Sequence, residues 1–211
     1  MARARGPTVG DPAPPLRLPC AQGGEIDLQS YRGRALVIVW FTKGFSCPFC
    51  RQQMSQLARV APKYRAVGAE VLVVSRTPAA LGRRYAERFT LPLPYLCDEA
   101  GEVRQAWGLE VRRRPLGFYA TKVVRRLWRP APIPADFGTH GVFGAPAGFR
   151  PTPRDIERIL ADEDTGFFVI DRRGVVCFAD RGSFRADGGR GALHPIPPSE
   201  VVLAVLERCA S

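Results

Sequence analysis

The feature that most constrains this chain is a continuous apolar run, ALVIVWF at residues 35–41, followed closely by a Cys-Pro-Phe-Cys tetrad at residues 47–50. The run is rich in β-branched residues, as expected of a strand buried on both faces of a sheet. After the tetrad, Met54, Leu57 and Ala61 recur at helical spacing, and a proline suits the first turn of a helix. The sequence therefore predicts a buried strand, a short loop and a helix beginning at about Pro48, with two cysteines at the junction.

Strands and helices alternate along most of the remaining chain. We expect strands at residues 16–18, 25–28, 70–75 and 94–97, and helices at residues 78–89, 99–107 and 198–209. A hairpin is predicted at residues 166–180, with its turn at Asp171–Gly174. Pro62 is expected to kink or break the helix that follows the tetrad, and Gly68 to end it. This alternation is typical of a three-layer α/β domain with parallel strands in its central sheet.

Residues 110–153 lack this periodicity and are rich in Arg, Pro and Gly, so we interpret them as an insertion within a single domain spanning residues 1–211. Short helices are expected at residues 118–128 and 155–162. The chain's one basic cluster lies here and consists of Arg112, Arg113, Arg114, Lys122, Arg125, Arg126 and Arg129. Interleaved apolar side chains would let this cluster dock an acidic partner protein or a membrane surface, but a solvated basic cover over the site is the simpler interpretation.

The net charge of +11 does not by itself indicate a nucleic-acid partner. Only Lys43, Lys63 and Lys122 of the 31 basic residues are lysines, which is typical of a genome-wide coding bias, and no nucleic-acid-binding motif accompanies the charge. No apolar run is long enough to span a membrane, and the Pro-rich sequence after the first residues is unlike a secretory signal. We therefore expect a cytoplasmic protein with no nucleic-acid partner and no membrane span.

The predicted chemistry lies in the tetrad. Cys47 falls at or just before the helix N-terminus, where unpaired N–H groups and the helix dipole stabilise a thiolate. Lys43 and Arg51 add positive charge nearby, and Ser46 is a candidate hydroxyl beside the thiol. Cys50 lies one helical turn further on, close enough to attack a sulfenic acid or a mixed disulfide formed on Cys47. We interpret the pair as a working dithiol with Cys47 as its nucleophile.

Half of a zinc site is another explanation of a Cys-x-x-Cys motif, but such a site needs two more ligands. The candidates, none of them paired at ligand spacing, are Cys97, Cys177, His140 and His194. No metal is therefore expected. We interpret Cys97 and Cys177 as buried structural thiols, with Cys97 as the reserve resolving thiol. Cys20 and Cys209 are interpreted as spectators.

Several segments resemble the AhpC/TSA superfamily of peroxiredoxins and thiol-disulfide reductases. The opening VGDPAPPLRLPCAQGGEIDLQSYRGRALVIVWF is similar to the start of that family, and DEAGEVRQAWG at residues 98–108 is similar to its D-x-x-G…(W/Y)-G segment. GFFVIDRRGVV resembles its F-V-I-D-x-x-G-x-(I/V) hairpin, and FTKGFSCPFCRQQM resembles a branch whose loop reads F-Y-R-G-x-W-C-P-x-C. The resemblance covers residues 9–110 and 165–209. It implies a thioredoxin-like fold that acts on a small hydroperoxide or disulfide with a thioredoxin- or glutathione-type reductant, needs no cofactor, and leaves room for a homodimer.

The chain departs from that family around the reactive cysteine. Typical members place Pro and Thr seven and three residues before it. Relative to Cys47 those positions hold Trp40 and Gly44, and in the register of the second cysteine they hold Lys43 and Cys47. The family's active-site arginine falls on Thr165. Three functions therefore stay open: a peroxiredoxin-like thiol peroxidase, a thiol-disulfide oxidoreductase without peroxidase activity, and a non-catalytic redox-sensing or binding protein.

Overall fold

The computed structural model describes residues 6–45, 47–88, 91, 93–112, 162–182 and 196–210. In chain order its elements are β1 (Arg17–Pro19), β2 (Glu25–Asp27), the 3-10 helix η1 (Leu28–Tyr31), β3 (Leu36–Thr42), α1 (Pro48–Ala66), β4 (Ala69–Ser75), α2 (Ala79–Arg88), β5 (Tyr95–Cys97), α3 (Glu102–Ala106), β6 (Val111–Arg112), β7 (Asp162–Glu163), β8 (Thr165–Ile170), β9 (Val176–Gly182) and α6 (Ser199–Ala210). None of the helices described is long and apolar enough to cross a membrane.

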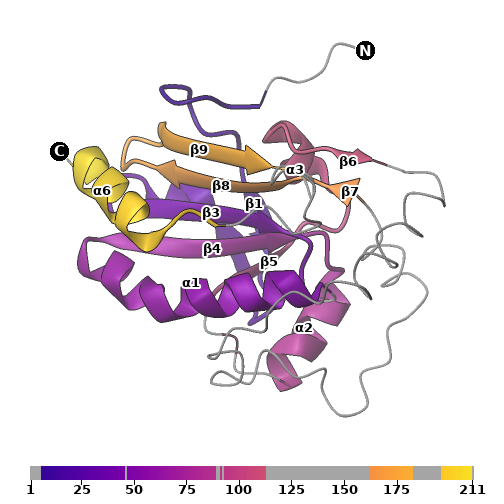
Figure 1. Cartoon of the computed structure of the whole chain (residues 1–211). Helices are drawn as coiled ribbons and strands as arrows, with labels where there is room; N and C mark the ends of the chain where they lie inside the picture. The colour runs from indigo at the N-terminus through magenta and orange to yellow at the C-terminus, as the bar shows by residue number, and fades with distance from the viewer. Residues whose placement is uncertain are drawn as a thin grey trace, which may run out of the picture.

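A five-stranded sheet in the order β5-β4-β3-β8-β9 lies at the centre of the described chain (Figure 1). β3 pairs in parallel with β4, from Leu36↔Ala69 to Thr42↔Ser75, and β4 pairs in parallel with β5. On its other side β3 pairs antiparallel with β8, which forms the predicted hairpin with β9. Every residue of β3 is buried, as its uninterrupted apolar sequence predicts. The sheet is therefore mixed, and the carboxyl ends of its three parallel strands lie at one edge.

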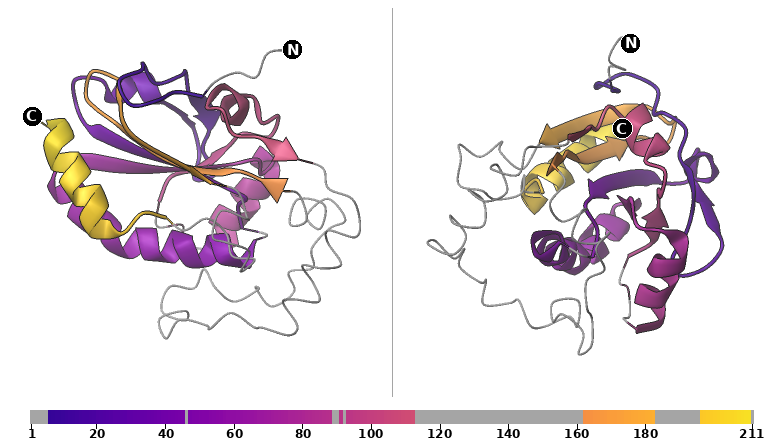
Figure 2. Two further views of the ribbon diagram at one scale, coloured as in Figure 1. Left: turned by 45° about the horizontal axis from the view of Figure 1, so that its top comes forward. Right: turned by 90° about the vertical axis from the view of Figure 1, so that its right-hand side faces the viewer.

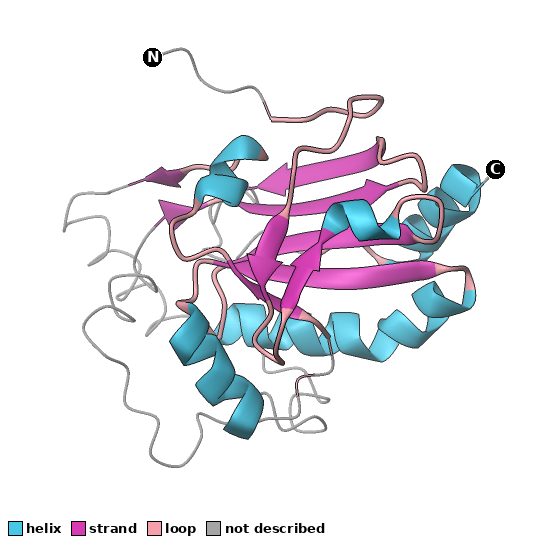
Figure 3. Cartoon of the chain, turned by 180° about the vertical axis from the view of Figure 1, so that it is seen from behind, coloured by secondary structure: helices cyan, strands magenta, loops and turns pink. Residues whose placement is uncertain are grey.

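Helices cover one face of this sheet, and the N-terminal strands cover the other. Ile38 and Trp40 of β3 belong to the first core cluster, together with residues of α1, α2 and α6. Figure 2 shows α1 and α6 on the same side of the sheet. The intervening residues of β3, such as Val39 and Phe41, belong to a second cluster built with β1, η1 and the segment after α3. Figure 3 shows the chain from the side of this second cluster, with the short N-terminal strands in front of the sheet. This alternation follows from the two-residue period of a strand. The two clusters give the molecule its three layers.

The short β6 and β7 pair antiparallel, with Arg112 opposite Asp162. Residues 112 and 162, which are distant in sequence, therefore lie side by side. That geometry suits the interpretation of the intervening segment as an insertion, which stays a prediction. The helix predicted at residues 118–128 lies outside the described residues, as does the helix predicted at 155–162 except for Asp162, which is in a strand.

Two local predictions differ in part from the structure. α1 is not broken at Pro62, because Ala61 and Tyr64 are buried in the core and their packing outweighs the hydrogen bond that a proline cannot donate. A kink at Pro62 stays a prediction. The helix expected at 99–107 is confined to Glu102–Ala106. It begins late because Gly101 adopts a positive φ of 77°, which a turn requires and a helix excludes.

The interpretation of Cys177 as a free thiol is wrong, and its partner is Cys209, for which the sequence predicted no contact. Cys177 and Cys209 form a disulfide with a Cα–Cα distance of 6.4 Å, which joins β9 to α6. The pairing arises because α6 packs against the β8–β9 hairpin on the first face of the sheet. The two cysteines are 32 residues apart in sequence, and no motif at that spacing predicts their pairing.

Candidate active site

α1 begins at the dithiol. Cys47 is the N-cap residue and Pro48 opens the helix, as the sequence predicts. The backbone N–H of Cys47 donates to the carbonyl oxygen of Gly44 at 3.2 Å, which turns the chain sharply between β3 and α1. Cys47 is 4% exposed and Cys50 is fully buried, and both are free thiols. The structure thus places two reduced cysteines at the carboxyl end of β3, nearly enclosed by protein.

Several hydrogen bonds converge on the Cys50 sulfur. It accepts from the hydroxyl of Thr42 and from the backbone N–H of Lys43, and it is hydrogen-bonded to Cys47. Burial raises the pKa of Cys50 well above its usual value, and the hydrogen bond and charge of Cys47 raise it further. The two donors act in the opposite direction, because they stabilise a thiolate. Cys50 is therefore protonated at neutral pH.

The loop between β3 and α1 rests on three buried hydroxyls. The Ser75 hydroxyl donates to the Tyr95 oxygen at 2.6 Å, and the Thr77 hydroxyl lies 2.7 Å and 2.8 Å from these two oxygens. Gly44, at φ 89°, lies directly against this triad, since a Cβ there would meet the Tyr95 hydroxyl at 2.5 Å. Phe45 also packs on the Tyr95 ring, with centroids 5.0 Å apart. The absence of a side chain at Gly44 thus lets the loop approach the sheet closely.

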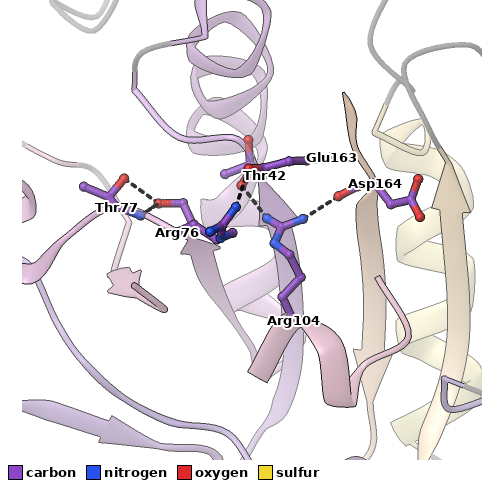
Figure 4. A network of polar contacts seen from close by, with 7 residues as sticks. Thr42, Arg76, Thr77, Arg104, Glu163 and Asp164 are labelled. Atoms are coloured by element: carbon purple, nitrogen blue, oxygen red, sulfur yellow. Dashed lines mark hydrogen bonds and ion pairs between the residues drawn. The ribbon is translucent and has the colours of Figure 1, made fainter. Parts of the chain in front are cut away.

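A polar network lies behind the end of β3 (Figure 4). Arg104 of α3 is 1% exposed, and its guanidinium donates to the carbonyl oxygens of Thr42, at 2.6 Å, and of Asp164. Beside it, Arg76 forms an ion pair of 3.1 Å with the buried carboxylate of Glu163. The contacts of Arg104 join α3 and the β7–β8 junction to the end of β3, the strand that precedes the dithiol, and the Arg76–Glu163 pair joins the end of β4 to β7.

Sequence reasoning missed Arg104 as a site residue. The signal that could have found it is its spacing, three residues before Trp107, which places both residues on the inward face of a short helix. The backbone N–H of Arg104 donates to the buried carboxylate of Asp98 at 2.8 Å, so the start of α3 is fixed as well. The fixed start of α3 therefore limits the directions in which the Arg104 side chain can extend.

Three of the other predicted site residues lie among the described residues, and one does not. Lys43 is buried, and its backbone N–H is one of the donors to Cys50. Thr165 is buried at the start of β8, where its hydroxyl donates to the carbonyl oxygen of Gly182 at 3.2 Å. The backbone of Arg51 lies in the first turn of α1. Ser46 lies outside the described residues.

Cys97 lies at the end of β5 and packs toward α2. Its sulfur leaves no room for a side chain at Gly82, where a Cβ would come within 2.6 Å of it. Burial raises the pKa of Cys97 to about 11, and the nearby Cys20 raises it in the same direction. Cys97 is therefore protonated at neutral pH. Its role as reserve resolving thiol stays a prediction.

Within the described parts of the chain, no three His, Cys, Asp or Glu side chains gather as a metal site requires. Of the zinc ligands considered from the sequence, Cys177 is engaged in the disulfide. His140 and His194 lie outside the described residues. The arrangement at the end of β3 is that of a pair of free thiols.

The family model described as "AhpC/TSA family" matches residues 9–135, more than half of the chain. The chain belongs to the AhpC/TSA family. Among its relatives is a putative peroxiredoxin, MT2597, of Mycobacterium tuberculosis, 30% identical over 125 residues that cover 59% of this chain and 79% of the relative. Another is the chloroplastic peroxiredoxin Q of Sedum lineare, 29% identical over 102 residues, 48% of this chain and 54% of the relative. The chain thus spans about half the length of the chloroplast relatives that it matches.

Solved structures agree with the AhpC/TSA assignment at the level of fold. Peroxidoxin BcpB from Mycobacterium tuberculosis superposes with a TM-score of 0.57 at 20% identity, covering 97% of this chain and 99% of that one. A mutant of Xylella fastidiosa PrxQ superposes with a TM-score of 0.62 at 13% identity, covering 98% and 99%. The predicted thioredoxin-like α/β fold is confirmed.

Proposed function

We propose that this AhpC/TSA protein is a thiol-dependent peroxidase in which Cys47 attacks a small hydroperoxide and Cys50 resolves the product. The observation that supports it best is the direct hydrogen bond between the two thiols at the start of α1. The helix N-terminus stabilises negative charge on Cys47, while burial keeps Cys50 protonated. This division of roles is what an attacking and a resolving thiol require.

The proposed reaction has two steps. The Cys47 thiolate attacks the terminal oxygen of the hydroperoxide, the O–O bond breaks, and the alkoxide leaves as an alcohol after taking a proton, so that Cys47 becomes a sulfenic acid. Cys50 then loses its proton and attacks the Cys47 sulfur, the S–O bond breaks, and water leaves. The Cys47–Cys50 disulfide is returned to two thiols by a dithiol donor of the thioredoxin or glutathione class.

A thiol-disulfide oxidoreductase without peroxidase activity is the second candidate. The observation that favours it is the buried second cysteine of a Cys-x-x-Cys motif with a raised pKa, an arrangement that also suits disulfide exchange. The same first step would then occur on the sulfur of a disulfide substrate. A cytoplasmic setting and a homodimer belong to the proposal as predictions. The non-catalytic alternative is kept as an outcome of the experiment below.

Peroxide consumption with dithiothreitol as reductant tests the proposal. The proteins to compare are wild type, Cys47→Ser, Cys50→Ser and, as a matched control, Cys97→Ser, whose thiol lies at the same end of the sheet. We expect Cys47→Ser to lose turnover by about a thousandfold or more, because serine cannot replace a thiolate nucleophile. Cys97→Ser should retain turnover within about twofold.

Insulin reduction, measured alongside, separates the candidates. Cys47-dependent insulin reduction without peroxide turnover would assign the protein to the thiol-disulfide oxidoreductases. If neither activity depends on Cys47, the dithiol is not a catalytic centre, and the non-catalytic alternative replaces the proposal.

A further inference from the structure

Arg104 is a buried cation in the network of Figure 4, and its guanidinium reaches the last residue of β3. Burial of a guanidinium is costly unless its donors are satisfied. Two of its nitrogens donate to the carbonyl oxygens of Thr42 and Asp164, and its charge lies over the Phe41 ring at 5.9 Å from the centroid. Its Nε has no hydrogen-bond partner among the described residues. The side chain is therefore fixed by main-chain atoms at the very strand that leads to the dithiol.

One peptide group connects Arg104 to Cys50. The carbonyl oxygen of Thr42, which accepts from Arg104 at 2.6 Å, and the N–H of Lys43 belong to the same peptide unit. That N–H donates to the Cys50 sulfur. A cation at the oxygen end of a peptide polarises it and makes its N–H a stronger donor, because hydrogen bonds in a chain reinforce one another. The same contact holds the backbone of Thr42, whose hydroxyl is the second donor to Cys50.

We infer that Arg104 is a positioning residue for the resolving thiol: it holds and polarises the Thr42–Lys43 peptide so that both donors point at the Cys50 sulfur. This rests on the proposed dithiol function of Cys47 and Cys50. The effect of Arg104 falls on the second step, in which Cys50 gives up its proton and attacks sulfur. A donor that stabilises the forming thiolate lowers the barrier to that step. We expect the first attack, by Cys47, to depend less on this peptide, whose two donors are directed at Cys50.

An aromatic disulfide, 5,5′-dithiobis(2-nitrobenzoate), reports the two steps separately and requires no peroxide. The reduced Cys47 thiolate attacks one sulfur of the reagent, forming a mixed disulfide and releasing the first thionitrobenzoate. Cys50 then loses its proton to solvent, attacks the Cys47 sulfur and releases the second thionitrobenzoate, leaving the Cys47–Cys50 disulfide. Stopped-flow absorbance with one equivalent of reagent gives the two rates, and mass spectrometry of quenched samples identifies the cysteines involved.

The variants to compare are wild type, Arg104→Met, Arg104→Lys and Arg76→Met. We expect Arg104→Met to slow the second release between about threefold and tenfold, the range that one weakened donor predicts, and to leave the first within about twofold. Arg104→Lys should lie between wild type and Arg104→Met, because an amine still carries the charge. Arg76→Met disturbs the neighbouring ion pair with Glu163 but not the Thr42–Lys43 peptide, so its two rates should keep their wild-type ratio.

Two results would overturn the inference, because each indicates a general structural effect. One is that Arg104→Met slows both releases by the same factor. The other is that Arg76→Met slows the second release as much as Arg104→Met does. If Arg104→Met does not fold, Arg104→Lys decides. A shorter amine cannot hold both carbonyl oxygens, so we expect its second release alone to slow, by about twofold. Absence of peroxide turnover in wild type would contradict the proposed peroxidase and leave this result unaffected.

Discussion

The two cysteine pairs of this chain lie at opposite ends of the same sheet and differ in state. Cys47 and Cys50 follow the carboxyl end of β3 and are free thiols. Cys177 follows Val176, which pairs with Ile170 and hence lies beside the amino end of β3, and it is disulfide-bonded to Cys209. One pair is local, within a single helical turn, while the other closes a separation of 32 residues.

The difference shows that surroundings, more than sulfur chemistry, decide what a cysteine pair does. At the first end a helix N-terminus, a tight loop and backbone donors surround the sulfurs, so proton and electron transfer are favoured. At the second end the partners are an edge strand and the C-terminal helix, so the bond joins two elements that would otherwise be held by packing alone. We interpret the first pair as chemical and the second as structural.

The largest expected effect on stability comes from the structural pair. Replacing both Cys177 and Cys209 with serine should lower the free energy of unfolding by about 3.5 kcal/mol, because the unfolded chain regains the entropy of an open loop of this length. Urea unfolding without reductant measures it. Added dithiothreitol should bring wild type to the variant's midpoint. Two results would contradict a structural role for this pair. One is that wild type and the variant have the same urea midpoint without reductant, and the other is that the variant loses the turnover of the Cys47–Cys50 dithiol.

At the chemical end, Gly44→Ala should cost about 3 kcal/mol, the sum of a positive φ and a clash with the hydroxyl triad. A Cβ there would lie 2.5 Å from the Tyr95 hydroxyl and 2.9 Å from the Thr77 hydroxyl. Gly10→Ala is the matched control, because Gly10 has φ 94° but nothing within 4 Å of a Cβ. We expect it to cost only about 1 kcal/mol by urea unfolding. Equal costs would mean that the loop does not press on the triad.

The strand and helix that flank the dithiol, and the β8–β9 hairpin, could be predicted from sequence because their signals are local. The apolar run before the tetrad, Pro48 at the helix start and the hairpin turn at Asp171–Gly174 each carry their own pattern. The Cys177–Cys209 disulfide and the reach of Arg104 to Thr42 could not be predicted, because both join segments distant in sequence. The break considered at Pro62 does not occur for a related reason, since the local penalty of the proline is outweighed by core packing on either side.

The smallest effect concerns Cys97, a third thiol at the chemical end. Its pKa is raised to about 11 in the folded state, whereas the unfolded thiol ionises near 9.0. Between these values the unfolded chain has lost the proton and the folded chain keeps it, so stability falls as the pH rises. Urea unfolding from pH 8 to 11 should show wild type losing more stability than Cys97→Ala. Parallel curves for the two proteins would contradict a raised pKa.

The central claim is that Cys47 and Cys50 form the redox pair while Cys177 and Cys209 do not turn over. The most direct test is to reduce the protein briefly, remove the reductant, add one equivalent of hydroperoxide, block remaining thiols and map the disulfides by peptide mass spectrometry. We predict that a Cys47–Cys50 disulfide appears in proportion to the peroxide consumed, and that the Cys177–Cys209 bond is present before and after at the same level. If peroxide is consumed while Cys47 and Cys50 are both recovered with the blocking group, and so had remained free thiols, the account is contradicted.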